Sequence, residues 1–433
     1  MPEIRGAKGS TVFVEPSHDT PLVWLSVIVR TGSAHDPVDQ EGFWRHAFEL
    51  ARRGTRSRSR EALDEALDRL GASFDSLTAR DYSGFSGLCL VDNLDDYIAL
   101  AAEVLSEPRF GEDEHERLIR ESLHYLDEVR DDDSDVAMRF FNRHVAPGYA
   151  YARTSLGTED SLNGLGCAAL AKGFSSSVSA GRLIIGLAGD IDETRALEVS
   201  ARLTANLDAG SPGTDSPIKT PEELPPSRVI LVDKPKRTQS QIMLGHLAPT
   251  YGSRDYTALL PVEAAFGGMF SSRMMQEIRV KRGWSYGAYC RMSKARSNYW
   301  LRMTLAPSQE QTAPALQLIA DLYRELADEG VHGDELDFAK RFLSGQTAFQ
   351  LDTARRRLGA AMEPALLGSP AGFIADLPKN LAALRDDEAW AATQRWIRPD
   401  KLCTVIVSTA SALRSALEDL DLGPIEVVGY DSY

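Results

Sequence analysis

The sequence predicts an α+β protein built from two similar halves, each a mixed β-sheet with packed helices. The length is the first reason, because 433 residues exceed what one compact core usually holds. A segment rich in Pro, Gly, Ser and Thr, residues 208–228, divides the chain almost evenly. A similar order of strands and helices recurs on both sides of that segment. The predicted domains are therefore residues 1–210 and 229–433, joined by a linker at 211–228.

The first half opens with an almost continuously apolar strand at residues 22–30 (LVWLSVIVR), as expected for a sheet packed against helices. Apolar periodicity and turn residues predict the elements that follow. These are helices at 42–53 and 59–70, strands at 72–78 and 82–91, helices at 92–105 and 112–130, a strand at 182–188 and a helix from Thr194.

The second half repeats this alternation, beginning with a strand at residues 241–247. The elements predicted after it are helices at 257–266 and 271–282, strands at 285–291 and 300–305, helices at 309–326 and from Gly333, a strand at 402–408 and a helix at 410–420. Both halves therefore end with a strand followed by a helix.

The composition argues against several classes of function. A formal net charge of −15, from 48 basic and 63 acidic residues, disfavours nucleic acid as a partner. Four scattered cysteines form no CxxC pair, which is typical of reduced thiols in an intracellular protein. No apolar run has the length of a membrane span, and the N-terminal residues lack the apolar stretch of a secretory signal. These patterns predict a cytoplasmic protein without a membrane partner.

Residues 42–55 (GFWRHAFELARRGT) carry the first family resemblance. The segment resembles the signature of the M16 (pitrilysin or insulinase type) peptidases, in which an H-x-x-E-H motif precedes Gly-Thr. In that family the two histidines bind zinc and the glutamate activates water. The matching positions here are Arg45, Phe48 and Glu49. Because Arg has no lone pair for a metal and Phe cannot accept a proton, the resemblance implies a degenerate zinc site and no cofactor in this chain.

The same resemblance places the family's third zinc ligand at Glu121, in the run ERLIRESL. Arg45 and Glu49 are spaced i,i+4, so we expect the Arg45 guanidinium to lie between Glu49 and Glu121 in place of the metal. An alternative is a metal site formed by His46, Glu49 and Glu121. The His46 side chain, however, projects about 100° around the helix from position 45.

Residues 267–289 (GGMFSSRMMQEIRVKRGWSYGAY) resemble the conserved segment of the family's C-terminal half. The resemblance implies that Arg279 and Tyr286 bind the substrate backbone and stabilise the developing oxyanion, since one offers cationic donors and the other a hydroxyl. The alternative is structural: Arg279 pairs with Glu277 or another carboxylate, and Tyr286 is a strand residue in the core.

As a whole, the resemblance implies the metallohydrolase fold of the mitochondrial processing peptidase and LuxS, with two homologous domains in a clam-shell arrangement. It implies the non-zinc subunit of a heterodimeric M16B-type metallopeptidase, inactive alone, whose zinc-bearing partner cleaves peptides or leader and unfolded segments. A second interpretation is a non-enzymatic scaffold or peptide-binding subunit, similar to the core subunits of respiratory complexes. A third is a homodimeric peptidase with a non-standard metal.

Overall fold

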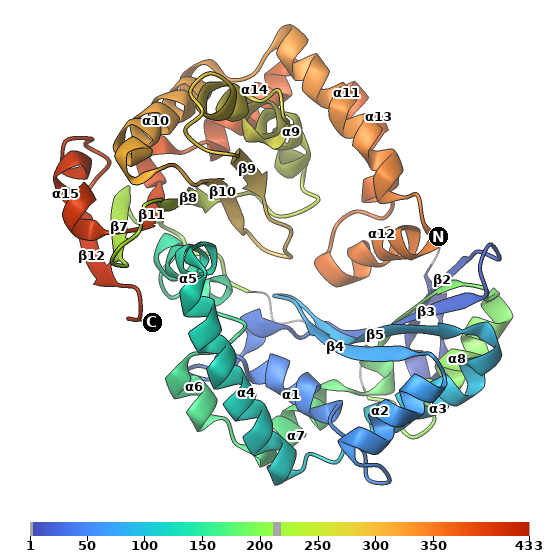
Figure 1. The fold of residues 1–433 in the computed structure, drawn as a ribbon. Helices are drawn as coiled ribbons and strands as arrows, with labels where there is room; N and C mark the ends of the chain where they lie inside the picture. Colours follow the sequence, from blue (N-terminus) through green and yellow to red (C-terminus); the bar gives the residue numbers. More distant parts are fainter. Residues whose placement is uncertain (1–2, 211–217, 433) are drawn as a thin grey trace. The chain divides into compact units, whose positions relative to one another are not determined.

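The computed structural model describes residues 3–210 and 218–432. These residues form two compact units, each with one six-stranded mixed sheet and helices on both of its faces (Figure 1). The sequence prediction of two mixed-sheet-plus-helix domains is therefore confirmed. Within the described residues, the first unit comprises 3–126, 153–210 and 349–373, and the second comprises 127–152, 218–348 and 374–432.

The sheet of the first unit has the strand order β1-β2-β6-β3-β5-β4. Only β2 and β6 run parallel, and every other neighbouring pair is antiparallel. The strands are β1 (Ile4–Arg5), β2 (Thr11–Pro16), β3 (Leu22–Val29), β4 (Ser73–Thr78), β5 (Ser83–Leu90) and β6 (Ile184–Gly189).

The helices of the first unit bury their apolar sides against both faces of this sheet. Helices α1, α3 and α8 pack on one face, and α12 packs on the other over β2 and β6 (Figure 1). A Cβ at Gly186 would lie 2.4 Å from the Met362 sulfur, so glycine allows α12 to approach β6 closely. The helices are α1 (Phe43–Ala51), α2 (Arg60–Arg69), α3 (Leu94–Ser106), α4 (Glu112–Asp131), α6 (Glu159–Gly164), α7 (Cys167–Ser177), α8 (Glu193–Thr204) and α12 (Ala354–Leu367).

The sheet of the second unit repeats the first, with the order β12-β7-β11-β8-β10-β9. Its parallel pair, β7 and β11, corresponds to β2 and β6, and β8, β10 and β9 correspond to β3, β5 and β4. The outermost strand differs, because β12 runs parallel to β7 whereas β1 is antiparallel to β2. The strands are β7 (Arg228–Asp233), β8 (Gln241–Leu247), β9 (Ala288–Met292), β10 (Trp300–Leu305), β11 (Cys403–Ser408) and β12 (Ile425–Gly429).

Helix α5 covers one face of the second sheet over β8 and β11, and the remaining helices build the main core on the other face (Figure 1). The indole N–H of Trp300 in β10 donates to Oδ1 of Asn142 in α5 at 2.7 Å, both side chains being buried. The helices are α5 (Asp133–Val145), α9 (Arg254–Glu263), α10 (Thr312–Glu329), α11 (Gly333–Gln350), α13 (Phe373–Ala383), α14 (Asp386–Trp396) and α15 (Ala410–Glu418). Two π-helical turns, Ala264–Gly268 and Met275–Val280, follow α9.

Helices α5 and α12 are exchanged between the two halves of the sequence. Helix α5 comes from the first half and completes the second unit, and α12 comes from the second half and completes the first unit. The predicted ranges 1–210 and 229–433 therefore describe the order of the repeat along the chain, whereas the compact units exchange one segment in each direction. Part of the predicted linker, residues 211–217, lies outside the described residues.

The structure corrects two predicted strand positions. Both halves were expected to open with the strands now seen as β3 and β8, but β2 and β7 precede them. Strand β7 begins at Arg228, the last residue of the predicted linker, because the apolar run VILV follows immediately after a Pro-rich segment. Among the described residues, no helix combines the length and apolar character needed to cross a membrane.

Candidate functional site

Helix α1 carries the three positions that correspond to the zinc motif. Its N-terminal end is fixed by Asp36, whose carboxylate accepts hydrogen bonds from the backbone N–H groups of Gly42 at 2.8 Å and Trp44 at 2.9 Å. Gly42 has a φ of 88°, in the left-handed region that glycine adopts without strain. Burial raises the pKa of Asp36 to about 7, although the two backbone hydrogen bonds oppose this shift.

Phe48, at the position of the catalytic glutamate, belongs to the core of the first unit. Its side chain is fully buried, and its ring centroid lies 5.5 Å from that of Phe85 and 5.1 Å from that of Phe174. Aromatic packing of this kind stabilises the fold. The position therefore contributes to packing between α1, β5 and α7, and offers no group that can accept a proton.

Arg45 contacts Glu49, with 3.5 Å between Nε and Oε2, and its guanidinium lies 5.8 Å from the centroid of the Tyr125 ring. The predicted contact of Arg45 with Glu49 is present, but the predicted position between Glu49 and Glu121 is taken by Arg53. Arg53 makes both contacts, through Nη2 at 3.5 Å from Glu49 Oε1 and 2.5 Å from Glu121 Oε2. Both arginines lie beside α4, but Arg45 lies next to Tyr125, whereas Arg53 lies next to Glu114 and Glu121.

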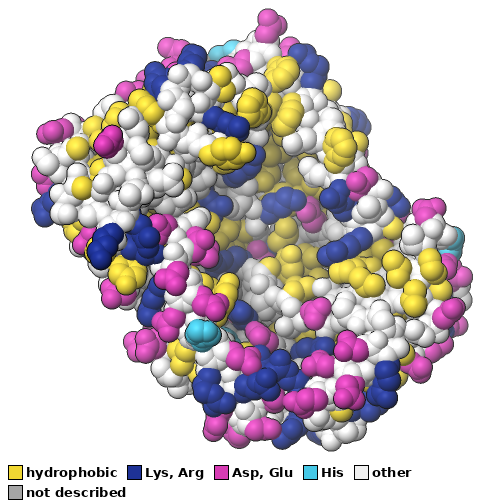
Figure 2. Space-filling model, viewed as in Figure 1, with side chains coloured by type: hydrophobic (Ala, Val, Ile, Leu, Met, Phe, Trp, Pro, Cys, Tyr) yellow, Lys and Arg dark blue, Asp and Glu magenta, His cyan; other side chains and the backbone are white. Residues whose placement is uncertain are grey.

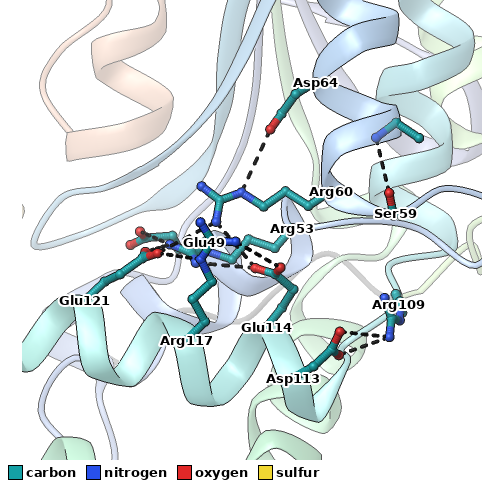
Figure 3. Close-up of polar contacts among 11 residues, drawn as sticks. Glu49, Arg53, Ser59, Arg60, Asp64, Arg109, Asp113, Glu114, Arg117 and Glu121 are labelled. Carbon is teal, nitrogen blue, oxygen red and sulfur yellow. Dashed lines mark hydrogen bonds and ion pairs between the residues drawn. The ribbon is translucent and has the colours of Figure 1, made fainter.

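Arg53 is the centre of a cluster of arginines and glutamates between α1, α2 and α4 (Figure 3). Its side chain is only 8% exposed, and Nη1 also lies 3.5 Å from Glu114 Oε2. Arg60 lies 3.4 Å from Glu114 and 3.9 Å from Glu121, and Arg117 lies 2.9 Å from Glu121. Cationic side chains therefore surround the carboxylates on the side where a metal ion would have to approach.

The electrostatics of this cluster favour its charged form. The hydrogen bond from Arg53 is the main cause that lowers the pKa of Glu121, which keeps this carboxyl ionised. Burial opposes the charge on Arg53, but the hydrogen bond to Glu121 and the nearby carboxylates raise the pKa of Arg53 above its usual value. Glu49 and Glu121 are thus held close together by a guanidinium.

His46 lies on a buried side of α1 and has partners for both ring nitrogens. Nδ1 lies 2.8 Å from the Gly42 carbonyl, and Nε2 lies 2.9 Å from the Ser122 hydroxyl. Burial lowers the pKa of His46 to about 4, so the ring is neutral near pH 7. Within residues 3–210 and 218–432, no group of three or more His, Cys, Asp and Glu side chains is arranged to hold a metal ion. The alternative site with His46 as a ligand therefore lacks a free nitrogen.

Arg279 and Tyr286, the two residues predicted from the second signature, are brought together in the second unit. The Arg279 guanidinium lies 4.5 Å from the Tyr286 ring centroid and 5.1 Å from that of Phe270. Tyr286 is 85% exposed and Phe270 is 63% exposed. Arg279 is therefore held against two aromatic rings at the surface of this unit, an arrangement favoured by the ring quadrupole.

The structural alternative for this pair does not fit the geometry. Glu277 is engaged by Lys281 and by Arg282, whose Nη1 lies 2.5 Å from Glu277 Oε2. Among the described side chains, no carboxylate forms an ion pair with Arg279. Tyr286 lies outside the core, at the surface between the π-helical turn and β9.

Five residues of these two clusters were not predicted. Glu114 precedes Glu121 by seven residues on α4, and this spacing of two helical turns could have indicated a shared face. Arg53 could have been found by its i,i+4 spacing from Glu49. The full set of unpredicted residues is Arg53, Arg60, Glu114, Arg117 and Phe270.

Comparison with known proteins gives consistent relatives over most of the chain. Residues 11–159 match the model of "Insulinase (Peptidase family M16)", and residues 170–343 match that of "Peptidase M16 inactive domain". A Bacillus subtilis protein named "Uncharacterized zinc protease YmxG" is 20% identical, over 81% of this chain and 84% of its own length. A Helicobacter pylori protein named "Non-peptidase homolog YmxG" is 22% identical, over 86% of this chain and 85% of its own length.

Two solved structures share the fold. The M16 inactive-domain peptidase structure from Pseudomonas fluorescens superposes with a TM-score of 0.85 at 24% identity, covering 94% of this chain and 97% of that one. A protease from Helicobacter pylori superposes with a TM-score of 0.83 at 18% identity, covering 94% and 99%. These structures show the shared fold, and the two family models, which together match residues 11–159 and 170–343, show that the chain belongs to peptidase family M16.

Proposed function

We propose that this chain is the zinc-less subunit of a heterodimeric M16 peptidase that cleaves peptides or unfolded segments. In such a complex, a homologous partner with an intact H-x-x-E-H motif would supply the zinc ion that activates water. This chain would contribute Arg279 and Tyr286. The substituted positions 45 and 48 support the first part, because Arg45 has no lone pair for a metal ion and Phe48 has no group that accepts a proton. The free and buried state of all four cysteines suits our proposed cytoplasmic location.

One observation supports the role of this chain most strongly, namely the state of Arg279. Its guanidinium stacks on Tyr286 and Phe270, and no carboxylate neutralises it among the side chains described. An arginine kept for stability alone normally pairs with a carboxylate or a carbonyl. Arg279 instead presents N–H donors at an exposed surface, where they can bind a peptide carbonyl.

The chemistry proposed for this pair is electrostatic. When water attacks a peptide carbonyl, negative charge develops on the carbonyl oxygen, and preorganised donors stabilise that charge more than they stabilise the bound substrate. The Arg279 N–H groups and the Tyr286 hydroxyl are donors of this type. Stacking on two rings limits the directions in which the guanidinium can point, so less entropy is lost when the substrate binds.

The test uses the purified full-length chain, alone and mixed with an M16 homologue from the same genome that retains H-x-x-E-H. We expect no zinc and no cleavage of a quenched fluorescent peptide with the chain alone, and cleavage with the mixture. Arg279→Ala should lower kcat/KM of the mixture by about 100-fold or more, the typical loss for one oxyanion donor. Arg282→Ala is the matched control, since that neighbouring arginine is paired with Glu277. Full activity of the Arg279→Ala complex would refute the assigned role.

A second candidate function is a non-enzymatic scaffold or peptide-binding subunit, and the name "Non-peptidase homolog" of the Helicobacter pylori relative favours it. The same experiment separates the two. A scaffold would co-purify with its partner and bind peptides, but Arg279→Ala would leave every measured rate unchanged.

A further inference from the structure

The Gly267–Gly268 turn lies directly beside a half-buried ion pair that the proposed chemistry does not use. Glu263, in the last turn of α9, is 8% exposed, and its Oε1 lies 3.1 Å from Nη1 of Arg291 in β9. Burial raises the pKa of Glu263 to about 7, and the neighbouring Arg291 guanidinium opposes this shift, so a cation at this place favours the charged carboxylate. Arg291 provides that cation from the strand beside the turn.

Arg291 also binds the turn itself. Its Nη2 donates to the Gly268 carbonyl at 2.9 Å, and its Nη1 lies 3.3 Å from the Gly267 carbonyl. One planar guanidinium therefore holds the Glu263 carboxylate and two successive backbone carbonyls, which the single ammonium of a lysine could not do with the same geometry.

The two glycines are required by this close packing. A Cβ at Gly268 would lie 3.0 Å from Arg291 Nη1, and a Cβ at Gly267 would lie 2.4 Å from the backbone nitrogen of Cys290. A side chain at position 267 would push the turn away from the β9 backbone, and one at position 268 would displace the Arg291 guanidinium. We call the cluster of Glu263, Gly267, Gly268 and Arg291 the turn clamp.

The turn clamp holds the backbone two residues before Phe270. On the other side of Phe270, Arg273 is fixed by Glu335 through two contacts, of 2.9 Å from Nε and 2.7 Å from Nη2. Phe270 therefore lies on a short segment held at both ends, and its exposed ring is directed at the Arg279 guanidinium.

The energies show why such support is needed. An exposed cation–π contact contributes less free energy than is lost when one backbone residue is ordered. The contact between Phe270 and Arg279 is thus too weak to order the turn by itself, and its geometry has to come from a backbone that is already fixed.

We propose that Glu263 and Arg291 are positioning residues, which fix the Gly267–Gly268 turn so that Phe270 stays stacked on Arg279. The importance of this arrangement for catalysis rests on the proposed function, but the positioning itself does not. The contacts to two carbonyls and the requirement for two glycines carry the inference.

The first arm of the test measures positioning directly, on the chain alone. The Nε–H NMR signal of Arg279, assigned by its loss in Arg279→Lys, reports the ring currents of Phe270 and Tyr286. We expect Arg291→Met and Arg291→Lys to move this signal part of the way towards that of a freely exposed arginine, because Phe270 leaves the guanidinium while Tyr286 still stacks on it. Asp133→Asn is the matched control, because it breaks another half-buried ion pair of the same unit, the 2.6 Å pair with Lys234. An unmoved Arg279 signal in folded Arg291→Lys would overturn the proposal.

Glu263→Gln covers the case in which Arg291→Met does not fold, since it keeps the side-chain volume and removes only the charge. It should shift the Arg279 signal in the same direction, and an unmoved signal would again overturn the proposal.

The second arm uses the active complex. Arg291→Lys should lower kcat more than it raises KM, and it should have no further effect in an Arg279→Ala background. An additional loss in that background would contradict positioning through Arg279. If the wild-type complex shows no cleavage at all, the proposed function fails while the NMR arm still decides the role of the turn clamp.

Discussion

Replacing Arg53 with methionine tests whether this arginine holds the carboxylates of Glu49 and Glu121 together. The substitution keeps most of the apolar part of the side chain and removes the guanidinium. Glu49, Glu114 and Glu121 then lose the one cation that contacts all three. We expect a marked loss of stability and a rise in the pKa of Glu121, because the hydrogen bond from Arg53 is the main cause that lowers it.

The magnitude follows from burial. Removing one partner of a buried pair costs about 3–5 kcal/mol, whereas an exposed pair contributes less than about 1 kcal/mol. Arg53 is 8% exposed, but Glu49 is 29% and Glu121 is 44% exposed, so solvent screens part of the repulsion. Arg60 and Arg117 also remain as partners for the carboxylates. We therefore expect a loss of about 2–3 kcal/mol in the free energy of unfolding.

Urea unfolding followed by tryptophan fluorescence measures this loss. Arg117→Met is the matched control, because that arginine also contacts Glu121 but is 49% exposed, and its removal should cost less than about 1 kcal/mol. The reasoning is refuted if the two variants lose the same stability, or if Arg53→Met unfolds at the urea concentration of the wild type.

Three further predictions concern buried positions. The pKa of His46, lowered by burial to about 4, means that the unfolded chain binds the proton more tightly, so stability falls as the pH drops from about 6.5 towards 4. Between pH 7 and pH 5, the free energy of unfolding measured in urea should fall by about 2 kcal/mol less in His46→Asn than in the wild type. Phe48→Glu should lower the free energy of unfolding, measured by thermal unfolding, by about 4 kcal/mol or more, because it buries a carboxylate at a 1% exposed position. The variant should not gain zinc. A stable variant that binds zinc would contradict this account. Gly267→Ala should cost about 1–3 kcal/mol in urea unfolding, whereas Gly345→Ala, whose Cβ meets no atom within 4 Å, should not destabilise; equal effects would argue against the close contact with Cys290.

The strands and helices that the sequence predicted best are those with a clear apolar period. Residues 241–247 form β8 with the predicted bounds, and residues 300–305 form β10. Strands β2 and β7 were missed because each adjoins turn-forming residues, which obscure where its apolar run begins or ends. The exchange of α5 and α12 leaves no signal in apolar periodicity, since an amphipathic helix does not specify which sheet covers its apolar side.

The residues at positions 45, 48 and 49 could be compared with the zinc motif from the sequence alone, because the comparison depends only on which residues occupy three positions. The contact of Arg53 with Glu121 could not be predicted in this way, because it depends on how α1 and α4 pack in three dimensions. Similarly, the family resemblance predicted that Arg279 and Tyr286 belong to one site. The sequence did not predict Phe270, because its contact with Arg279 depends on the turn that precedes it.

The exchange of α5 and α12 has a consequence for what happens if the chain is cut between its halves. A fragment ending at residue 210 would carry α5 with Val136, Phe140 and Phe141, all fully buried in the intact protein, and no sheet to cover them. The complementary fragment would carry α12 in the same state. Neither fragment is a finished folding unit, so a single cleavage should leave two pieces that remain bound to each other. Such pieces should be recovered together by co-expression, and each should aggregate when produced alone.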